Sequence, residues 1–267
     1  MQYELGLVGG GNMAEAIVRA VIDNQIISPE RIAIADPVAE RRELFKPLGV
    51  ALAESNEAVM GYASQVMLAI KPQTLAAIGD QLKVIDPARQ IVLSIMAGVS
   101  TKRIAEVIGK PARVVRIMPN TPLMVGRGMS AIALGEHARS GDELLALQVF
   151  RAAGEAVMVE ESQMDAVTAV SGSGPAYVFY LAEAMTDAAR QLGLEPSVAG
   201  LLVQQTILGA AKLMKDSQEE PAALRRKVTS PGGTTQAAIE HMESADLKRH
   251  IIDALAKAAA RSKELGK

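Results

Sequence analysis

The sequence predicts an α/β domain at the N-terminus and an all-α domain at the C-terminus. Two observations support this prediction. Short apolar runs bounded by turn residues alternate with helical patterns over roughly the first 160 residues. From Glu160 onward the apolar residues follow a helical period, and no convincing strand pattern remains. We therefore predict two domains, residues 1–160 and residues 161–267.

The first domain is expected to contain a parallel sheet with helices on both faces. Its apolar runs are short, and helical patterns separate many of them; the segment 13–23, for example, places Ile17, Val18 and Val21 on one face. Ser55 is suited to cap a helix over 56–62, and Ser100 or Thr101 to cap one ending at Gly109. The expected strands are 5–8, 31–35, 65–70, 90–95, 113–117, 129–133 and 156–159.

The second domain is predicted to consist of helices separated by glycines. The segments 175–192 and 196–215 form two long helices that are rich in Ala and Leu and carry few charges. Such helices need a partner surface, and we favour the core of a dimer over packing against the first domain. The remaining expected helices are 163–170, 221–227, 234–241 and 245–265.

The composition excludes several classes of partner. The net charge of −2 gives no field that would attract nucleic acid or anionic lipid. The absence of cysteine excludes disulfides and thiolate metal sites, and we expect no metal. No basic leader is visible, and no continuous apolar run reaches the roughly 18 residues of a membrane span. We expect a cytoplasmic protein that does not bind membranes.

A glycine turn follows the first expected strand. The residues Gly9, Gly10, Gly11, Asn12, Met13 and Ala14 match the pattern G-x-G-x-x-A between a strand and a helix. In such a turn Gly9 permits the sharp bend and Gly11 lets the backbone approach a pyrophosphate. Ala14 allows close packing of helix on strand, and the helix N-terminus offers free N–H groups. The first domain is therefore predicted to be a Rossmann-type domain that binds NAD or NADP.

Asp36, which follows Ala35 at the end of the second strand, leaves the choice of cofactor open. An acid at this position binds the ribose 2′-hydroxyl of NAD. Arg41 and Arg42 follow shortly, and a guanidinium there suits the 2′-phosphate of NADP. An equally weighted alternative is that Asp36 only caps a helix starting at Pro37.

Three further loops are expected at the same edge of the sheet, where open α/β sheets bind ligands. Lys71 is notable because it follows a buried strand directly, although most loop lysines are simply solvated. The residues of these loops are Ser55 and Asn56; Ala69, Ile70, Lys71 and Pro72; and Met96, Ala97 and Gly98.

The helical half carries a second glycine loop, residues 229–235. Its hydroxyls, its glycine pair Gly232 and Gly233, and the helix that follows suit a carboxylate or phosphate, and a plain helix–helix turn is an equal alternative. The small-residue segment 171–175 and the polar turn around Asn120 are weaker candidates. His137, His241 and His250 lie outside all of these loops, so a reaction needing little acid–base help is favoured.

Taken together, these loops resemble those of the pyrroline-5-carboxylate reductase family. The resemblance runs through most of the chain and is strongest over 224–235, with similar segments at 165–177, 118–122, 66–72 and 9–14. It implies reduction of 1-pyrroline-5-carboxylate to L-proline by hydride transfer from NADPH or NADH, the last step of proline biosynthesis. It also implies an all-α C-terminal dimerisation domain, in the arrangement of 6-phosphogluconate dehydrogenases, with dimers that often assemble into decamers.

The resemblance further implies the roles of individual residues. Thr235 would reach the ring nitrogen of the substrate, and Lys71 would act near the nicotinamide. The resemblance implies that the substrate is held by Ser230, Gly233, Thr234 and Thr235. The positions of Gly232 and Asn120 in their loops add these two residues to the predicted substrate site. The resemblance implies that the cofactor is held by Gly9, Gly10, Gly11, Asn12, Met13, Ala14, Asn56, Ala69, Ile70, Lys71, Pro72, Met96, Ala97 and Gly98. Ala35 and Asp36 are added because they end the second expected strand, where the adenosine ribose is bound.

The sequence departs from the family pattern at Ala35 and Asp36, where members that favour NADPH often carry serine. Two rival functions share the motifs: a reductase of another cyclic imine or ketimine acid, and an inactive cofactor-sensing protein. A 3-hydroxyacid dehydrogenase is a weaker rival, because no lysine lies near the segment 171–175.

Overall fold

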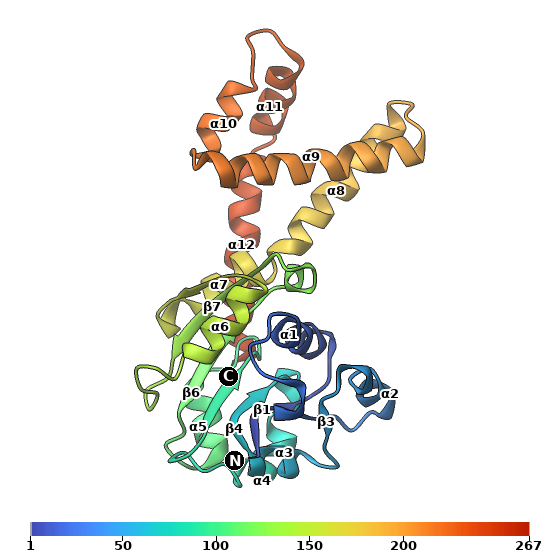
Figure 1. Ribbon diagram of the computed structural model, residues 1–267. Coiled ribbons are helices and arrows are strands. Elements are labelled where there is room, and N and C mark those ends of the chain that lie inside the picture. The colour runs from blue at the N-terminus through green and yellow to red at the C-terminus, as the bar shows by residue number, and fades with distance from the viewer. Residues whose placement is uncertain (1, 267) are drawn as a thin grey trace. The chain divides into compact units, whose positions relative to one another are not determined.

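The computed structural model describes residues 2–266. The chain forms two compact units (Figure 1). Unit 1 runs to Ser173 and also includes the residues from Ala256 onward, and unit 2 comprises Gly174–Leu255. Unit 1 continues past residue 160 because Met164 is buried against Ala131 and Ala133 of the sheet.

Unit 1 is built on an eight-stranded sheet of order β3-β2-β1-β4-β5-β6-β7-β8. All seven expected strands are confirmed, and the two-residue strand β3 was not predicted. The strands are β1 (Tyr3–Val8), β2 (Ile32–Ala35), β3 (Ala51–Leu52), β4 (Ala63–Leu68), β5 (Ile91–Ser94), β6 (Val114–Met118), β7 (Gly128–Leu134) and β8 (Gly154–Met158).

The prediction of a parallel sheet is correct for β1 to β6 and wrong for the last two strands. Strand β7 runs antiparallel to β6, and β8 runs parallel to β7. The physical reason lies in the connection after β6, which holds only a short 3-10 helix, Thr121–Val125. A parallel crossover needs a dozen or more residues, so this short connection reverses the chain.

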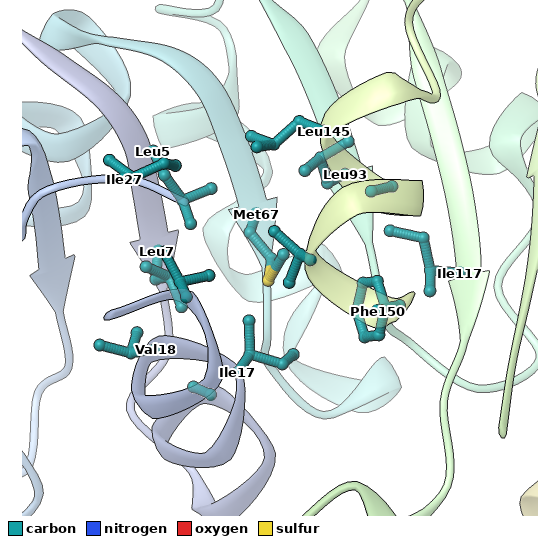
Figure 2. Close-up of a cluster of buried hydrophobic side chains, with 14 of the residues drawn as sticks. Leu5, Leu7, Ile17, Val18, Ile27, Met67, Leu93, Ile117, Leu145 and Phe150 are labelled. Atoms are coloured by element: carbon teal, nitrogen blue, oxygen red, sulfur yellow. The ribbon is translucent and has the colours of Figure 1, made fainter. Parts of the chain in front are cut away.

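Helices cover both faces of the sheet. Side chains of α1 and α6, including Ile17, Val18 and Phe150, point onto Leu7 and Met67 in the larger core cluster (Figure 2). Helices α4 and α5 bury Leu82 and Ile104 in a second cluster against the opposite face. The helices of unit 1 are α1 (Asn12–Asp23), α2 (Ala39–Glu43), α3 (Asn56–Tyr62), α4 (Gly79–Leu82), α5 (Thr101–Ile108), α6 (Leu144–Ala152) and α7 (Met164–Val167).

The expected helix over 163–170 is interrupted. It is replaced by a 3-10 turn, by α7 and by a π-helical turn, Thr168–Gly172. Gly172 permits the π-turn to lie close to β6, since a Cβ on this residue would overlap the Met118 methyl group.

Unit 2 is entirely helical, as predicted. Its long helices α8 and α9 pack on each other, and proline occupies the first turn of α9 and α10, where its missing N–H costs nothing. The helices are α8 (Gly174–Gln191), α9 (Pro196–Ser217), α10 (Pro221–Lys227), α11 (Thr234–Ser244) and α12 (Leu247–Leu265), the last of which ends in unit 1.

One helix, α9, is long and apolar enough to cross a bilayer when judged by length and composition alone. Its apolar residues do not form one continuous run, because Gln204, Gln205 and Thr206 interrupt the middle of the helix. Mostly buried helices in protein cores pass the same test, whereas 11% of this stretch of α9 is buried within the described residues.

Candidate active site

The glycine turn joins three strands at the carboxyl edge of the sheet. Gly9 lies at φ +103°, and its N–H donates to the Ala35 carbonyl oxygen over 2.8 Å. A Cβ on Gly9 would approach the Ala69 carbonyl oxygen to 2.6 Å. Only glycine meets both demands, so this residue fixes the ends of β1, β2 and β4 next to one another.

The N-terminus of α1 opens onto free space. Gly11 is the N-cap residue, and no side chain within the described residues caps the helix. A Cβ on Gly11 would contact nothing within 4 Å. Asn12, Met13 and Ala14 form the first helical turn, whose backbone N–H groups and dipole favour an anion. This cradle fits the pyrophosphate of a dinucleotide.

Asp36 holds the glycine turn from the end of β2. One carboxylate oxygen accepts the Gly10 N–H over 2.7 Å, and the other accepts the Val38 N–H over 2.8 Å. The helix that follows begins at Ala39 with Val38 as its N-cap residue, so Asp36 is not the cap of that helix. Both oxygens are therefore engaged by backbone donors of this chain.

Two arginines of α2 lie against the same turn. Arg41 donates from Nε to the Gly10 carbonyl oxygen and from Nη2 to Asn12 Oδ1, both over 2.8 Å. Arg42 donates to the Asp36 carbonyl oxygen over 2.5 Å. The sequence predicts that these arginines could meet the 2′-phosphate of NADP. No local pattern signals the bonds of Arg41 to the glycine turn or of Arg42 to Asp36.

The end of β4 and the start of α3 supply the next predicted residues. Ser55 accepts the Ala58 N–H over 3.2 Å, which confirms it as the cap of α3. Asn56 donates to Gln81 Oε1 over 2.7 Å. Ala69 continues the pairing of β4 with β1, and Lys71 is exposed immediately before the 3-10 turn that starts at Pro72.

The loop after β5 contains Met96, Ala97 and Gly98. Met96 is buried, and its N–H donates to Ser94 Oγ over 3.3 Å. Gly98 adopts φ +79°. Ser100, rather than Thr101, caps α5 by accepting the Arg103 N–H over 3.1 Å.

Asn120 lies after β6, and its amide is used within unit 1. Its Oδ1 accepts the Met129 N–H over 2.9 Å, and its Nδ2 donates to the Ser171 carbonyl oxygen over 3.2 Å. Asn120 therefore joins the β6–β7 connection to the π-turn, a contact over 51 residues that no local pattern signals.

The second glycine loop lies in unit 2. Gly232 has φ +71°, and its N–H donates to Gln236 Oε1 over 2.7 Å. Gly233 is the N-cap residue of α11 and is packed against Ser230, whose carbonyl oxygen accepts its N–H over 3.1 Å. Thr234 and Thr235 begin the helix, which has no side-chain cap. The loop thus presents a helix N-terminus with two hydroxyls.

The structure therefore brings the predicted cofactor residues to one edge of the parallel part of the sheet, as ligand binding in such sheets requires. The predicted substrate residues 230–235 belong to the other unit. The three histidines are exposed, as expected from their polar neighbours.

The strand order of the parallel part and the open glycine turn define a Rossmann-type dinucleotide-binding protein with a helical second unit. Residues 4–98 match the family described as NADP oxidoreductase coenzyme F420-dependent. Residues 161–265 match the family described as pyrroline-5-carboxylate reductase dimerisation.

Similarity to known proteins extends over the full length. A pyrroline-5-carboxylate reductase of Synechocystis is 42% identical over 100% of both chains. One from Methanosarcina acetivorans is 38% identical over 99% of this chain and 98% of its own. The chain belongs to the pyrroline-5-carboxylate reductase family.

Solved structures of relatives agree with this assignment. The Coxiella burnetii pyrroline-5-carboxylate reductase superposes with a TM-score of 0.91 at 37% identity, covering 100% of both chains. The Plasmodium falciparum pyrroline carboxylate reductase, solved with NADP bound, gives 0.88 at 29% identity with the same coverage.

Proposed function

We propose that this protein reduces 1-pyrroline-5-carboxylate to L-proline with NADPH or NADH, the last step of proline biosynthesis. The observation that carries the proposal is the full-length relationship to proteins of that name, which spans both glycine loops.

The cofactor is assigned to the sheet edge. The N-terminus of α1 holds the pyrophosphate, and the loops after β4 and β5 border the nicotinamide, whose reduced ring supplies the hydride. The proposed contact residues are Gly9, Gly10, Gly11, Asn12, Met13, Ala14, Ala35, Asp36, Asn56, Ala69, Ile70, Lys71, Pro72, Met96, Ala97 and Gly98.

The substrate is assigned to the second glycine loop. The N–H groups of the α11 N-terminus take the carboxylate, and the Thr235 hydroxyl orients the ring nitrogen. Ser230, Gly232, Gly233 and Thr234 shape this cradle. Asn120 contributes through the loop that its amide holds in place.

Hydride transfer to this substrate requires the protein to orient the two reactants more than to supply a strong acid. A cyclic imine that is already protonated accepts hydride at C5, so the protein need not transfer a proton to it. Positioning of two reactants alone supplies up to about 7–11 kcal/mol in favourable cases. Lys71 is assigned an electrostatic role beside the nicotinamide.

The contacts of Asp36 support acceptance of NADPH. Both of its oxygens already accept backbone N–H groups, and two guanidiniums lie beside it. The repulsion that a free carboxylate would exert on a 2′-phosphate is therefore reduced, and Arg41 and Arg42 can offset the rest.

We further propose a cytoplasmic homodimer, assembling to a decamer, that binds neither nucleic acid nor membrane. Residues 161–267 would form the dimerisation and substrate-binding domain. The three consecutive polar residues in the middle of α9, Gln204, Gln205 and Thr206, favour a protein partner over lipid as the cover of this helix.

Initial rates with NADPH and NADH test the proposal. We expect the five-membered imine acid to be reduced faster than its six-membered homologue, and Asp36→Ser to raise the preference for NADPH. Faster reduction of the six-membered ring would assign a different imine acid. If the absorbance of the reduced cofactor does not fall with the five-membered or the six-membered imine acid, the proposed activity is wrong and a cofactor-sensing protein is favoured.

A further inference from the structure

The end of helix α12 packs directly against the loop after β5. Gly98 in this loop lies so close to α12 that a Cβ would approach the Ser262 carbonyl oxygen to 2.9 Å and the Leu265 Cβ to 3.1 Å. In the opposite direction, a Cβ on Gly266 would overlap the Gly98 carbonyl oxygen. The two backbones are therefore in contact, and glycine is required on both sides of that contact.

Ser262 fixes the position of this helix end. It is the buried residue of α12, with 4% of its surface exposed. Its hydroxyl donates to Asp165 Oδ1 over 2.7 Å. Asp165 lies on α7, which packs on the sheet through Met164. This hydrogen bond, between residues 97 positions apart in the sequence, anchors the helix end to α7.

Glu161 binds the residue that directly follows the same loop. Its two carboxylate oxygens accept the Thr101 N–H over 2.7 Å and the Thr101 hydroxyl over 2.6 Å, at the start of α5. A cavity of about 340 Å³ is lined by Gly98 and Ser100 of the loop and by Glu161 and Asp165. Met96 and Val99 of this segment are buried in the second core cluster, so the backbone of Gly98 between them is held by that core and by the end of α12.

We propose that Ser262 is a positioning residue for the cofactor loop 96–98, acting through the last turn of α12. The proposal rests on the proposed function, which assigns this loop to the nicotinamide cofactor. Ser262 does not touch the cofactor in this proposal. It holds the helix end whose backbone supports Gly98, so that the loop is pre-shaped before cofactor binds.

The test is calorimetric measurement of the Kd for NADPH with the full-length protein. Ser262→Ala removes the hydroxyl and should raise this Kd about five- to tenfold, the loss expected for one hydrogen bond. Asp165→Ala should do the same, whereas Asp165→Asn keeps an acceptor oxygen and should restore nearly wild-type binding. We expect KM for cofactor to rise in step with Kd, with kcat changed less than about twofold.

A second variant acts on the contact without touching the hydrogen bond. Gly266→Ala places a Cβ against the Gly98 carbonyl oxygen and should also weaken NADPH binding. Gly61→Ala on α3 is the matched control, because a Cβ there would contact nothing within 4 Å. Hydrogen exchange of a peptide spanning residues 95–100 should increase in Ser262→Ala and Gly266→Ala and stay unchanged in Gly61→Ala.

The possible outcomes separate this inference from the proposed function. If folded Ser262→Ala and Gly266→Ala bind NADPH as tightly as the wild type, the positioning role is wrong. Failure of Asp165→Asn to restore binding also contradicts it. If the wild type itself binds neither NADPH nor NADH, the proposed function fails instead.

Discussion

The two units of this protein bury their apolar residues very differently. In unit 1 the sheet has covered faces, and Leu7, Met67 and Phe150 are almost completely buried. Within residues 174–255, all of which the structure describes, only Ala199 and Val203 are buried. Large side chains such as Phe179, Tyr180 and Leu201 are 67%, 74% and 68% exposed.

The difference indicates where each unit obtains its stability. Unit 1 closes a core of its own, whereas unit 2 leaves many large apolar side chains exposed, as surfaces that bind another protein do. The match of residues 161–265 to a dimerisation family accounts for that surface as an interface between copies. We therefore expect these exposed side chains to be covered when copies of the chain associate.

The largest expected effect comes from a charge on the exposed face of unit 2. Leu201→Arg should weaken dimerisation at least 100-fold, about 3 kcal/mol, because the guanidinium would be buried without a partner. Leu144→Arg in unit 1 is the matched control, since Leu144 is 62% exposed. Light scattering after size exclusion measures the mass. If both variants dissociate, or if neither does, the exposed apolar side chains of unit 2 do not differ from those of unit 1 in their role in dimerisation.

The two glycine loops provide the next test. Gly9→Ala combines φ +103° with a 2.6 Å approach to the Ala69 carbonyl oxygen, and should lower the free energy of unfolding by about 3 kcal/mol. Gly232→Ala has φ +71° and no atom within 4 Å of the new Cβ, and should cost about 1 kcal/mol. Urea unfolding of both variants compares them. If both variants lose the same free energy of unfolding, the close approach of the new Cβ to the Ala69 carbonyl oxygen has no energetic cost.

A third test addresses the chemistry assigned to unit 2. Thr235→Val keeps the side-chain volume, removes the hydroxyl and should lower kcat about tenfold, or about 1.4 kcal/mol, with cofactor binding intact. Thr229→Val in the same loop is the control, because the Thr229 hydroxyl donates to the Arg225 carbonyl oxygen. If Thr235→Val turns over as fast as the wild type, the Thr235 hydroxyl has no role in the reaction.

The smallest expected effect is a pH dependence confined to unit 1. Burial raises the pKa of Asp142, but hydrogen bonds from the Arg113 side chain and the Arg139 N–H outweigh it, so this pKa lies below its usual value. Because the pKa is lower in the folded protein than in the unfolded chain, where it is about 3.9, ionised Asp142 stabilises the fold. This stabilisation is fully present above about pH 3.9 and is lost as the pH falls further.

Urea unfolding between pH 5 and pH 3 measures this dependence. The wild type should lose more stability over that range than Asp142→Asn, whose side chain does not titrate. Ion pairs of unit 2 such as Arg225–Glu243 are exposed and should add little to the slope. If the free energy of unfolding of Asp142→Asn depends on pH as steeply as that of the wild type, Asp142 is not the source of the pH dependence.

Much of the fold follows from local patterns. Strands such as β1 and β5 are predictable because their apolar runs are bounded by turn residues, and the glycine turn is predictable because Gly9 must have positive φ. Strand direction is not a local property, so the reversal of β7 was missed. The two-residue strand β3 is too short to give a pattern.

The candidate site shows the same division between local and distant information. Gly9, Gly11 and Asp36 were found from spacing to a strand and a helix. The use of both Asp36 oxygens by Gly10 and Val38, and the contact of Ser262 with Asp165, depend on how distant segments pack. No periodicity or motif encodes such contacts.

The reversal of β7 also marks a place to attach a reporter. Leu134 at the end of β7 pairs with Val115 at the start of β6, so the turn that follows lies beyond the edge opposite the glycine turn. Ser140 in this turn is exposed, and the chain has no cysteine. Ser140→Cys would therefore carry a single fluorophore at one known position, from which assembly of the protein can be followed without a label in either glycine loop.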